Sequence, residues 1–166
     1  MIVRGSKVAN RTLELDVVVP ATLGEVWKAW STDKGVRSFL TPGSQIGIAV
    51  GGPYELVFDP DAPEGEKGTE GCKLLSYLPE QMISFEWRPP PSFPKLRKNK
   101  TRIILKMGPH PSGGVWINLV QAGLGRGKKW DALYDYLDQE WGKVLDRLNR
   151  RFSEGPADWS SERPFP

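Results

Sequence analysis

The chain has 166 residues, 23 of them basic and 20 acidic, so its formal net charge is +3 at neutral pH. Hydrophobic residues make up 39% of it, which is typical of a globular protein, and its length is that of one domain with one sizeable core. The near balance of charge gives no support to nucleic-acid binding. The single cysteine, Cys72, excludes an internal disulfide and a thiolate metal cluster within one chain.

No segment has the length and hydropathy of a membrane span. Residues 1–11 contain no continuous apolar stretch, and the longest apolar run nearby, Val17–Val19, ends at Pro20. A signal peptide or a membrane anchor needs a longer apolar segment. We therefore expect a cytoplasmic protein with no integral membrane association.

The first predicted elements are one strand and two helices. Residues 12–19 alternate between apolar and polar side chains and then run apolar up to Pro20, which predicts a strand. Thr22 and Glu25 have the spacing of a capping box, so a helix is expected to follow Thr22. A second short helix is expected over residues 33–40.

The middle of the chain predicts short strands with tight connections. In residues 82–87, apolar side chains alternate with polar ones, which is typical of an antiparallel strand with one buried face. A Gly-Gly-Pro sequence at 51–53 marks a tight turn, whereas the acidic residues 59–66 and the basic, Pro-rich residues 88–100 are predicted loops. The predicted strands are 44–50, 54–58, 68–77, 82–87, 101–107 and 115–121.

The last predicted element is a long helix over residues 127–152. Apolar residues recur in it at steps of three and four, and charged residues occupy the opposite face. Such a one-sided helix needs an apolar surface to lie along. Beyond Phe152, Gly155 and three prolines predict a loose tail. We therefore divide the chain into an N-terminal segment (1–11), one domain (12–152) and a flexible Pro-rich tail (153–166).

The order of these elements indicates an α+β fold. Strands that are joined by short turns pair antiparallel. The resulting sheet has one apolar face to cover, and the C-terminal helix is the only predicted element long enough to cover it. We expect a curved antiparallel sheet of six to seven strands wrapped around that helix.

Six sequence segments carry a resemblance to a known family over about residues 12–152. They are Val17–Pro20, Glu25–Trp30, Gly51–Gly52, Ile83–Trp87, Ile117–Gln121 and Trp141–Leu148. In this order they resemble the activator of heat shock protein ATPase homologue-like family, a part of the START-like, polyketide cyclase-like (SRPBCC) superfamily. The resemblance implies the helix-grip fold of START-like and Bet v-like proteins, the binding of a hydrophobic or lipid-like ligand, and a place in the stress response.

Little in the sequence supports catalysis. Nucleophilic catalysis needs a base, and the only histidine, His110, lies in a turn rich in Pro and Gly. Cys72 lies in a predicted strand, where a small apolar filler is the simpler interpretation. Residues 59–66 lack the spacing of a calcium loop, and residues 123–129 lack the pattern of a phosphate-binding loop. We therefore expect no catalytic residue, no metal and no cofactor.

The predicted sheet and helices would enclose an aromatic and apolar cavity. Such a lining, with a few polar groups, is typical of a small-molecule site, and for each residue the alternative is a fully packed core. The expected lining residues are Trp30, Phe39, Tyr54, Leu56, Phe58, Phe85, Trp87, Ile117, Leu119, Gln121, Tyr134, Leu137 and Trp141.

Three hypotheses for the function remain open. The first is a non-catalytic domain that binds a hydrophobic or amphipathic small molecule in this cavity. The second is a cyclase or aromatase-like enzyme, in which Gln121 and Tyr134 polarise a bound carbonyl or phenol. The third is a chaperone co-regulator that docks through Trp116 or through the basic residues 95–100. Nucleic acid is not an expected partner, and a monomer or a homodimer is expected.

Overall fold

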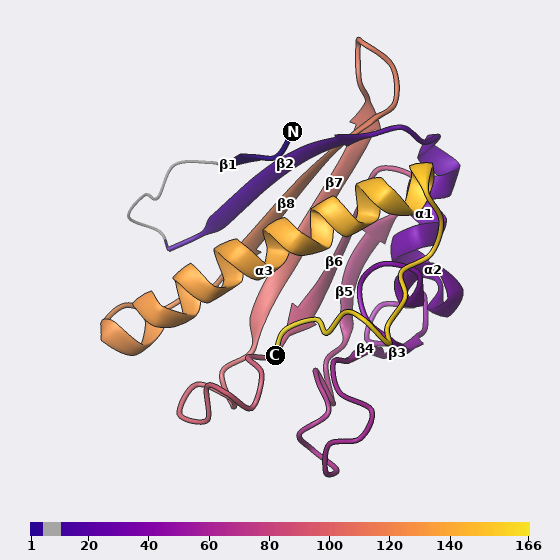
Figure 1. Cartoon of the computed structure of the whole chain (residues 1–166). Helices are drawn as coiled ribbons and strands as arrows, with labels where there is room; N and C mark the ends of the chain where they lie inside the picture. Colours follow the sequence, from indigo (N-terminus) through magenta and orange to yellow (C-terminus); the bar gives the residue numbers. More distant parts are fainter. Residues whose placement is uncertain (5–10) are drawn as a thin grey trace.

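The computed structural model describes residues 1–4 and 11–166. These residues form a six-stranded antiparallel sheet, a two-stranded sheet and three helices (Figure 1). The larger sheet has the order β1-β2-β8-β7-β6-β5, with β1 (Val3–Arg4), β2 (Leu13–Val19), β5 (Leu74–Leu78), β6 (Met82–Trp87), β7 (Thr101–Pro109) and β8 (Val115–Ala122). The smaller sheet pairs β3 (Gly43–Ile46) with β4 (Tyr54–Val57), and the helices are α1 (Leu23–Ser31), α2 (Asp33–Arg37) and α3 (Lys128–Ser153).

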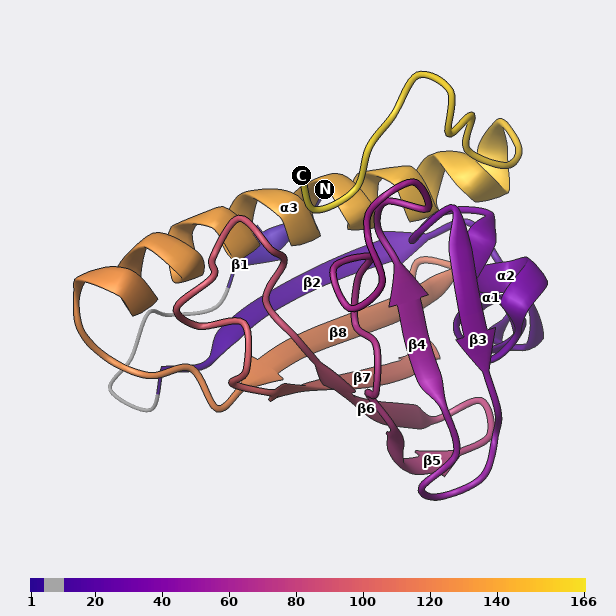
Figure 2. The ribbon, with the colours of Figure 1, turned by 90° about the horizontal axis from the view of Figure 1, so that it is seen from below.

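The pairing of β2 with β8 joins the first long strand to the last one. Leu15 lies opposite Leu119, and Val17 lies opposite Ile117, so the buried side chains of both strands share one face of the sheet. The residues that alternate with them on β2 are half-buried. Figure 2 shows α3 lying across the sheet on one side. The predicted α+β grip, with a C-terminal helix that covers the sheet, is therefore confirmed.

The long helix α3 follows its predicted range to within one residue at each end. Its apolar face is covered by the sheet and the loops, and its buried apolar residues include Leu133, Leu137, Trp141, Leu145 and Leu148. These residues recur at the three- and four-residue steps of the predicted stripe. None of the helices in the described part of the chain is both long and apolar enough to span a membrane.

A capping box begins α1, as the sequence predicts. The backbone N–H of Glu25 donates to the Thr22 hydroxyl over 3.2 Å, and the Glu25 carboxylate accepts the Thr22 backbone N–H over 2.8 Å. These bonds lower the pKa of Glu25 below its usual value. The cap fixes the start of the helix that carries Trp30, a fully buried residue of the core.

The largest differences from the predicted strands concern β1, β3 and β5, while the other strands lie within two residues of their predicted bounds. β1 is a two-residue strand that the sequence did not predict, because so short an element has no periodicity. β3 ends at Ile46, ahead of the predicted end at residue 50. Residues 68–73 form no continuous strand: they meet Pro53 and Val57 in isolated bridges, and β5 begins at Leu74. Gly71 breaks the strand there, since its φ of +80° is not a strand conformation.

The segment after α3 returns over the domain (Figure 1). Its prolines and Gly155 predict a loose tail. In the structure, however, residues 157–166 pack against the sheet and helices of the domain. The backbone N–H of Ala157 donates to the Ser38 carbonyl over 2.9 Å, and the Trp159 indole donates to the carbonyl of Arg37 over 2.6 Å. These contacts form because the segment carries aromatic surface that can be buried, which its proline content does not reveal.

We expect Trp141→Ala to lower the free energy of unfolding by about 3–5 kcal/mol, because it empties a large buried aromatic site. Leu148→Ala, at another fully buried position of α3, is the packed reference and should lose about 2–5 kcal/mol. Urea titration of the three proteins measures both losses. A loss below about 2 kcal/mol at Trp141 alone would show that this side chain borders open space.

Candidate ligand-binding site

The thirteen residues expected to line a cavity all lie in the interior. They come from α1, the segment after α2, β4 and the residue that follows it, β6, β8 and α3. The most exposed of them, Tyr134, shows 6% of its surface. The apolar members belong to one continuous core. The structure therefore brings the predicted set together between the sheet and the helices.

Aromatic rings fill much of this interior. Tyr54 on β4 stacks on Phe85 of β6 with ring centroids 3.9 Å apart, and its hydroxyl donates to the Trp30 carbonyl over 2.6 Å. Trp30 in turn meets Phe39 edge to face at 4.8 Å. Burial raises the pKa of Tyr54, so its phenol stays protonated.

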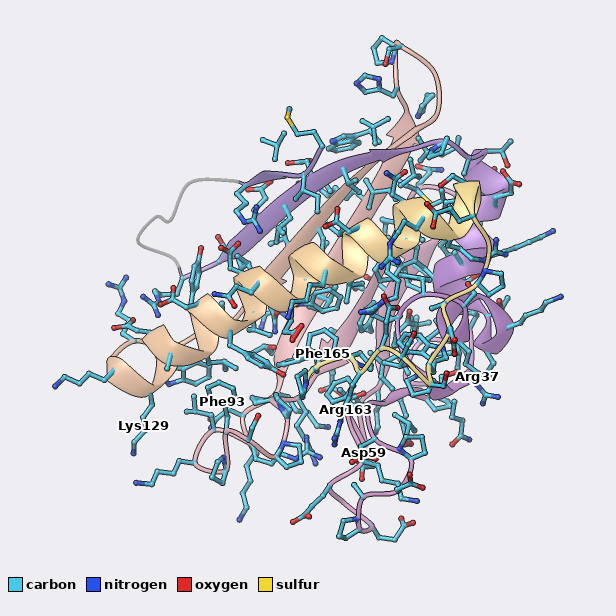
Figure 3. The ribbon with its side chains drawn as sticks, viewed as in Figure 1. Arg37, Asp59, Phe93, Lys129, Arg163 and Phe165 are labelled. Atoms are coloured by element: carbon cyan, nitrogen blue, oxygen red, sulfur yellow. The ribbon has the colours of Figure 1, made fainter. Side chains whose placement is uncertain are left out.

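One ring in the interior comes from outside the helix-grip elements. Phe165, near the end of the C-terminal segment, is 2% exposed and contacts Phe58, Trp87 and Trp141, with ring centroids 4.8, 5.6 and 5.1 Å away. Figure 3 shows Phe165 beside α3. Sequence reasoning missed this residue, although an aromatic side chain in an otherwise polar segment was the available signal.

Gln121 has partners for both ends of its side chain. Its carbonyl oxygen accepts a hydrogen bond from the Trp141 indole over 2.8 Å, and its amide nitrogen donates to the Thr101 hydroxyl over 2.8 Å. The Tyr134 hydroxyl instead donates to the Thr12 backbone carbonyl over 3.4 Å. The two polar groups of the enzyme hypothesis are thus engaged with different parts of the chain.

Two indole groups of the interior have no such partner. Trp30 Nε1 and Trp87 Nε1 are covered from solvent and make no hydrogen bond within the described part of the chain. Both side chains are 0% exposed. Buried donors are nearly always paired, so these two N–H groups stand out as unsatisfied donors of the described interior.

The two other residues considered for chemistry, Cys72 and His110, lie outside this interior set. Cys72 is 1% exposed, and burial raises the pKa of its thiol to about 11. His110 lies at the β7–β8 hairpin, where its Nδ1 is 2.6 Å from the Ser112 hydroxyl. Among the described residues, no group of three or more His, Cys, Asp or Glu side chains could hold a metal ion.

The two predicted docking features are also tied into the domain. Trp116 is half-buried on the outer face of the sheet, where its indole donates to Asp16 over 2.8 Å. It lines a groove of about 360 Å³ together with residues of the N-terminal segment. In the basic loop, Arg97 pairs with Glu70 at 3.2 Å and Lys100 with Glu86 at 3.3 Å, so part of its charge is neutralised within the chain.

A sheet closed by a C-terminal helix over an aromatic interior defines a START-like, polyketide cyclase-like helix-grip domain. The sequence matches the family model described as Activator of Hsp90 ATPase homolog 1-like protein over residues 20–153, so the chain belongs to that family. No curated protein matches the sequence.

Solved structures share the fold at low sequence identity. A Rhodobacter sphaeroides protein has a TM-score of 0.71 and 16% identity, with 92% of this chain and 99% of that one covered. Protein MLL2253 from Mesorhizobium loti has a TM-score of 0.70 and 16% identity, with 89% and 100% covered. The Aha1 dimer from Colwellia psychrerythraea has a TM-score of 0.65 and 14% identity, with 88% and 98% covered.

We expect the Cys72 thiol of the native protein to react about a hundredfold more slowly with Ellman's reagent at pH 8 than the thiol of the unfolded chain, because a pKa near 11 leaves little thiolate. Between pH 7 and 10 the native rate should rise about tenfold per pH unit, while the unfolded rate levels off near pH 9. A native rate close to the unfolded one would show that the thiol is accessible and reactive.

Proposed function

We propose that this domain binds a hydrophobic or amphipathic small molecule between the sheet and α3, without catalysing a reaction. The observation that carries the proposal is the pair of unpartnered indole N–H groups, Trp30 Nε1 and Trp87 Nε1, inside an aromatic interior. An unsatisfied buried donor costs about 1–3 kcal/mol, so a bound acceptor would remove that cost. The proposed ligand therefore has an apolar, preferably flat body and at least one hydrogen-bond acceptor.

The composition of the lining supports binding rather than catalysis. Its thirteen residues include no carboxylate, imidazole or amine, and their ionisable groups are the phenols of Tyr54 and Tyr134. Burial raises the pKa of Tyr54, so the phenol stays protonated at neutral pH and is not present as the phenolate that a general base would require. Gln121 is held by Trp141 and Thr101, so it serves in our proposal to position α3 and not to polarise a substrate.

A protein partner is the second candidate function. The observation that favours it is the groove beside Trp116 on the outer face of the sheet, which Met1, Val3 and Val18 also line. Apolar side chains around a half-buried Trp are typical of an interface anchor. A Trp116→Ala variant that still captures a chaperone as well as the wild type would count against this surface. We further propose a cytoplasmic location and either a monomeric or a homodimeric state.

The probe Prodan tests the proposed site, because it combines a naphthalene ring with a ketone acceptor and its emission reports the polarity of its surroundings. We expect Prodan to bind with a blue shift, and we expect Trp87→Phe to weaken binding up to about tenfold, which corresponds to the loss of one hydrogen bond. Fluorescence titration measures the dissociation constants. The absence of saturable binding, both to the wild type and to a variant whose interior is opened by Phe165→Ala, would overturn the proposed function.

Two controls separate the hydrogen bond from a general change in packing. Trp116→Phe makes the same substitution on the outer face of the sheet and should leave Prodan affinity unchanged. 2-(Dimethylamino)naphthalene lacks the ketone, so its affinity should be the same for the wild type and for Trp87→Phe. An equal loss for both ligands would assign the effect to the shape of the interior.

A further inference from the structure

The Phe165 ring occupies interior space that the helix-grip elements leave unfilled. Its three ring neighbours are Phe58, which directly follows β4, Trp87 of β6 and Trp141 of α3. All three neighbours are at most 4% exposed. Without the C-terminal segment, these rings would border a space the size of a benzyl group. A cavity of that size lined by aromatic rings is suited to a flat apolar group.

An entrance groove lies next to this ring. A hollow of about 230 Å³ is lined by Phe165 itself and by two loops, residues 58–67 and 90–92. The carbonyl oxygen of Pro166 accepts hydrogen bonds across its rim from the Tyr136 hydroxyl over 2.9 Å and from the Ser92 hydroxyl over 3.3 Å. The segment thus resembles an amphipathic ligand, with a ring inside the domain and an acceptor at the surface.

Ion pairs near the surface hold the segment in this place. The Glu162 carboxylate pairs with Arg147 at 3.3 Å and with Arg150 at 2.9 Å, and Arg163 pairs with Asp59. In Figure 3, Arg163 lies near the loop that carries Asp59. The Arg150 side chain is 50% exposed and that of Arg163 63% exposed, so salt screens their two pairs. The Arg147 side chain is only 6% exposed, so salt screens its pair with Glu162 less.

The segment divides into an anchored part and a part that can leave. Residues 157–159 are bound to the α2 region through the carbonyls of Arg37 and Ser38, and the Arg147 guanidinium lies over the Trp159 ring at 5.0 Å. Residues 160–166 form no helix or strand. Ser160 and Ser161 are hydrogen-bonded to Asp158 of the anchored part, whereas the contacts of Glu162, Arg163 and Phe165 and the Pro166 carbonyl join the rest of the segment to the domain. Loss of those few contacts releases the ring while residues 157–159 stay bound.

We propose that residues 160–166 are a displaceable plug, and that the subsite filled by the Phe165 ring receives the aromatic or other flat apolar group of the ligand. This inference rests on the proposed small-molecule function. It adds to that function the route by which the ligand enters, and it identifies the Phe165 ring as a part of the chain that competes with the ligand for the subsite. A group that replaces the ring lies against Trp87, whose Nε1–H has no partner. Displacement of the plug therefore brings the ligand into contact with the indole that carries this unsatisfied donor.

Prodan binding to Phe165→Ala tests the plug. We expect an affinity about tenfold higher than that of the wild type, because binding no longer has to compete with the bound ring. Circular dichroism confirms that the variant is folded. Hydrogen exchange of residues 160–166 gives an independent readout: addition of Prodan to the wild type should speed exchange there, whereas ordinary ligand binding slows exchange near the site.

A charge variant tests the same plug without changing the interior. Glu162→Gln removes the partner of Arg147 and Arg150 and should raise Prodan affinity about two- to fivefold, an effect that becomes smaller in 1 M salt because the exposed pair with Arg150 is screened. Glu154→Gln is the matched control, since it makes the same charge change on an exposed residue at the start of the segment. It should leave the affinity unchanged.

The outcomes separate the plug from the proposed function. If Prodan binds the wild type and Phe165→Ala equally and exchange in residues 160–166 does not rise, the plug is overturned and ligand binding stands. If Prodan binds neither the wild type nor Phe165→Ala, both the proposed function and the plug are overturned. Binding to Phe165→Ala that is tighter than to the wild type, with faster exchange of the segment, supports both.

Discussion

A chain of hydrogen bonds from Trp141 through Gln121 to Thr101 joins α3 to two neighbouring strands of the sheet. Because all three side chains are at most 1% exposed, each of these polar groups must find its partner inside the protein. The bonds set the rotation of α3 about its axis, which apolar contacts alone fix loosely. That rotation decides which side chains of α3 face the interior, so the shape of the candidate site depends on it.

Much of the fold was predictable because the decisive signals are local. The capping box at Thr22 and the stripe of α3 depend on residues three and four apart, and the faces of β2 and β8 depend on alternation. The same patterns identified the thirteen interior residues. They could not decide whether those residues line a ligand cavity or a packed core, since both roles require an inward-facing apolar side chain.

The features that the sequence did not reveal depend on contacts between distant segments. β1 forms because it can pair with β2, and Phe165 is buried because a space exists among residues 58, 87 and 141. Pro and Gly in a sequence indicate that a segment does not form a regular helix or strand. They say nothing about a free volume elsewhere in the fold, and therefore a segment with three prolines can still supply a core residue.

Two kinds of contact hold the C-terminal segment, and they have different effects. Burial of a Phe ring stabilises a protein by about 1.5–3 kcal/mol, whereas an ion pair as exposed as that of Arg163 with Asp59 contributes about 0–1 kcal/mol. Phe165 therefore supplies most of the attraction, and the ion pairs mainly select where the segment lies. A ligand with a flat apolar group can replace the contacts of the ring without matching those charges. The interior therefore selects the shape of the group that is bound, and the surface charges determine where the C-terminal segment lies.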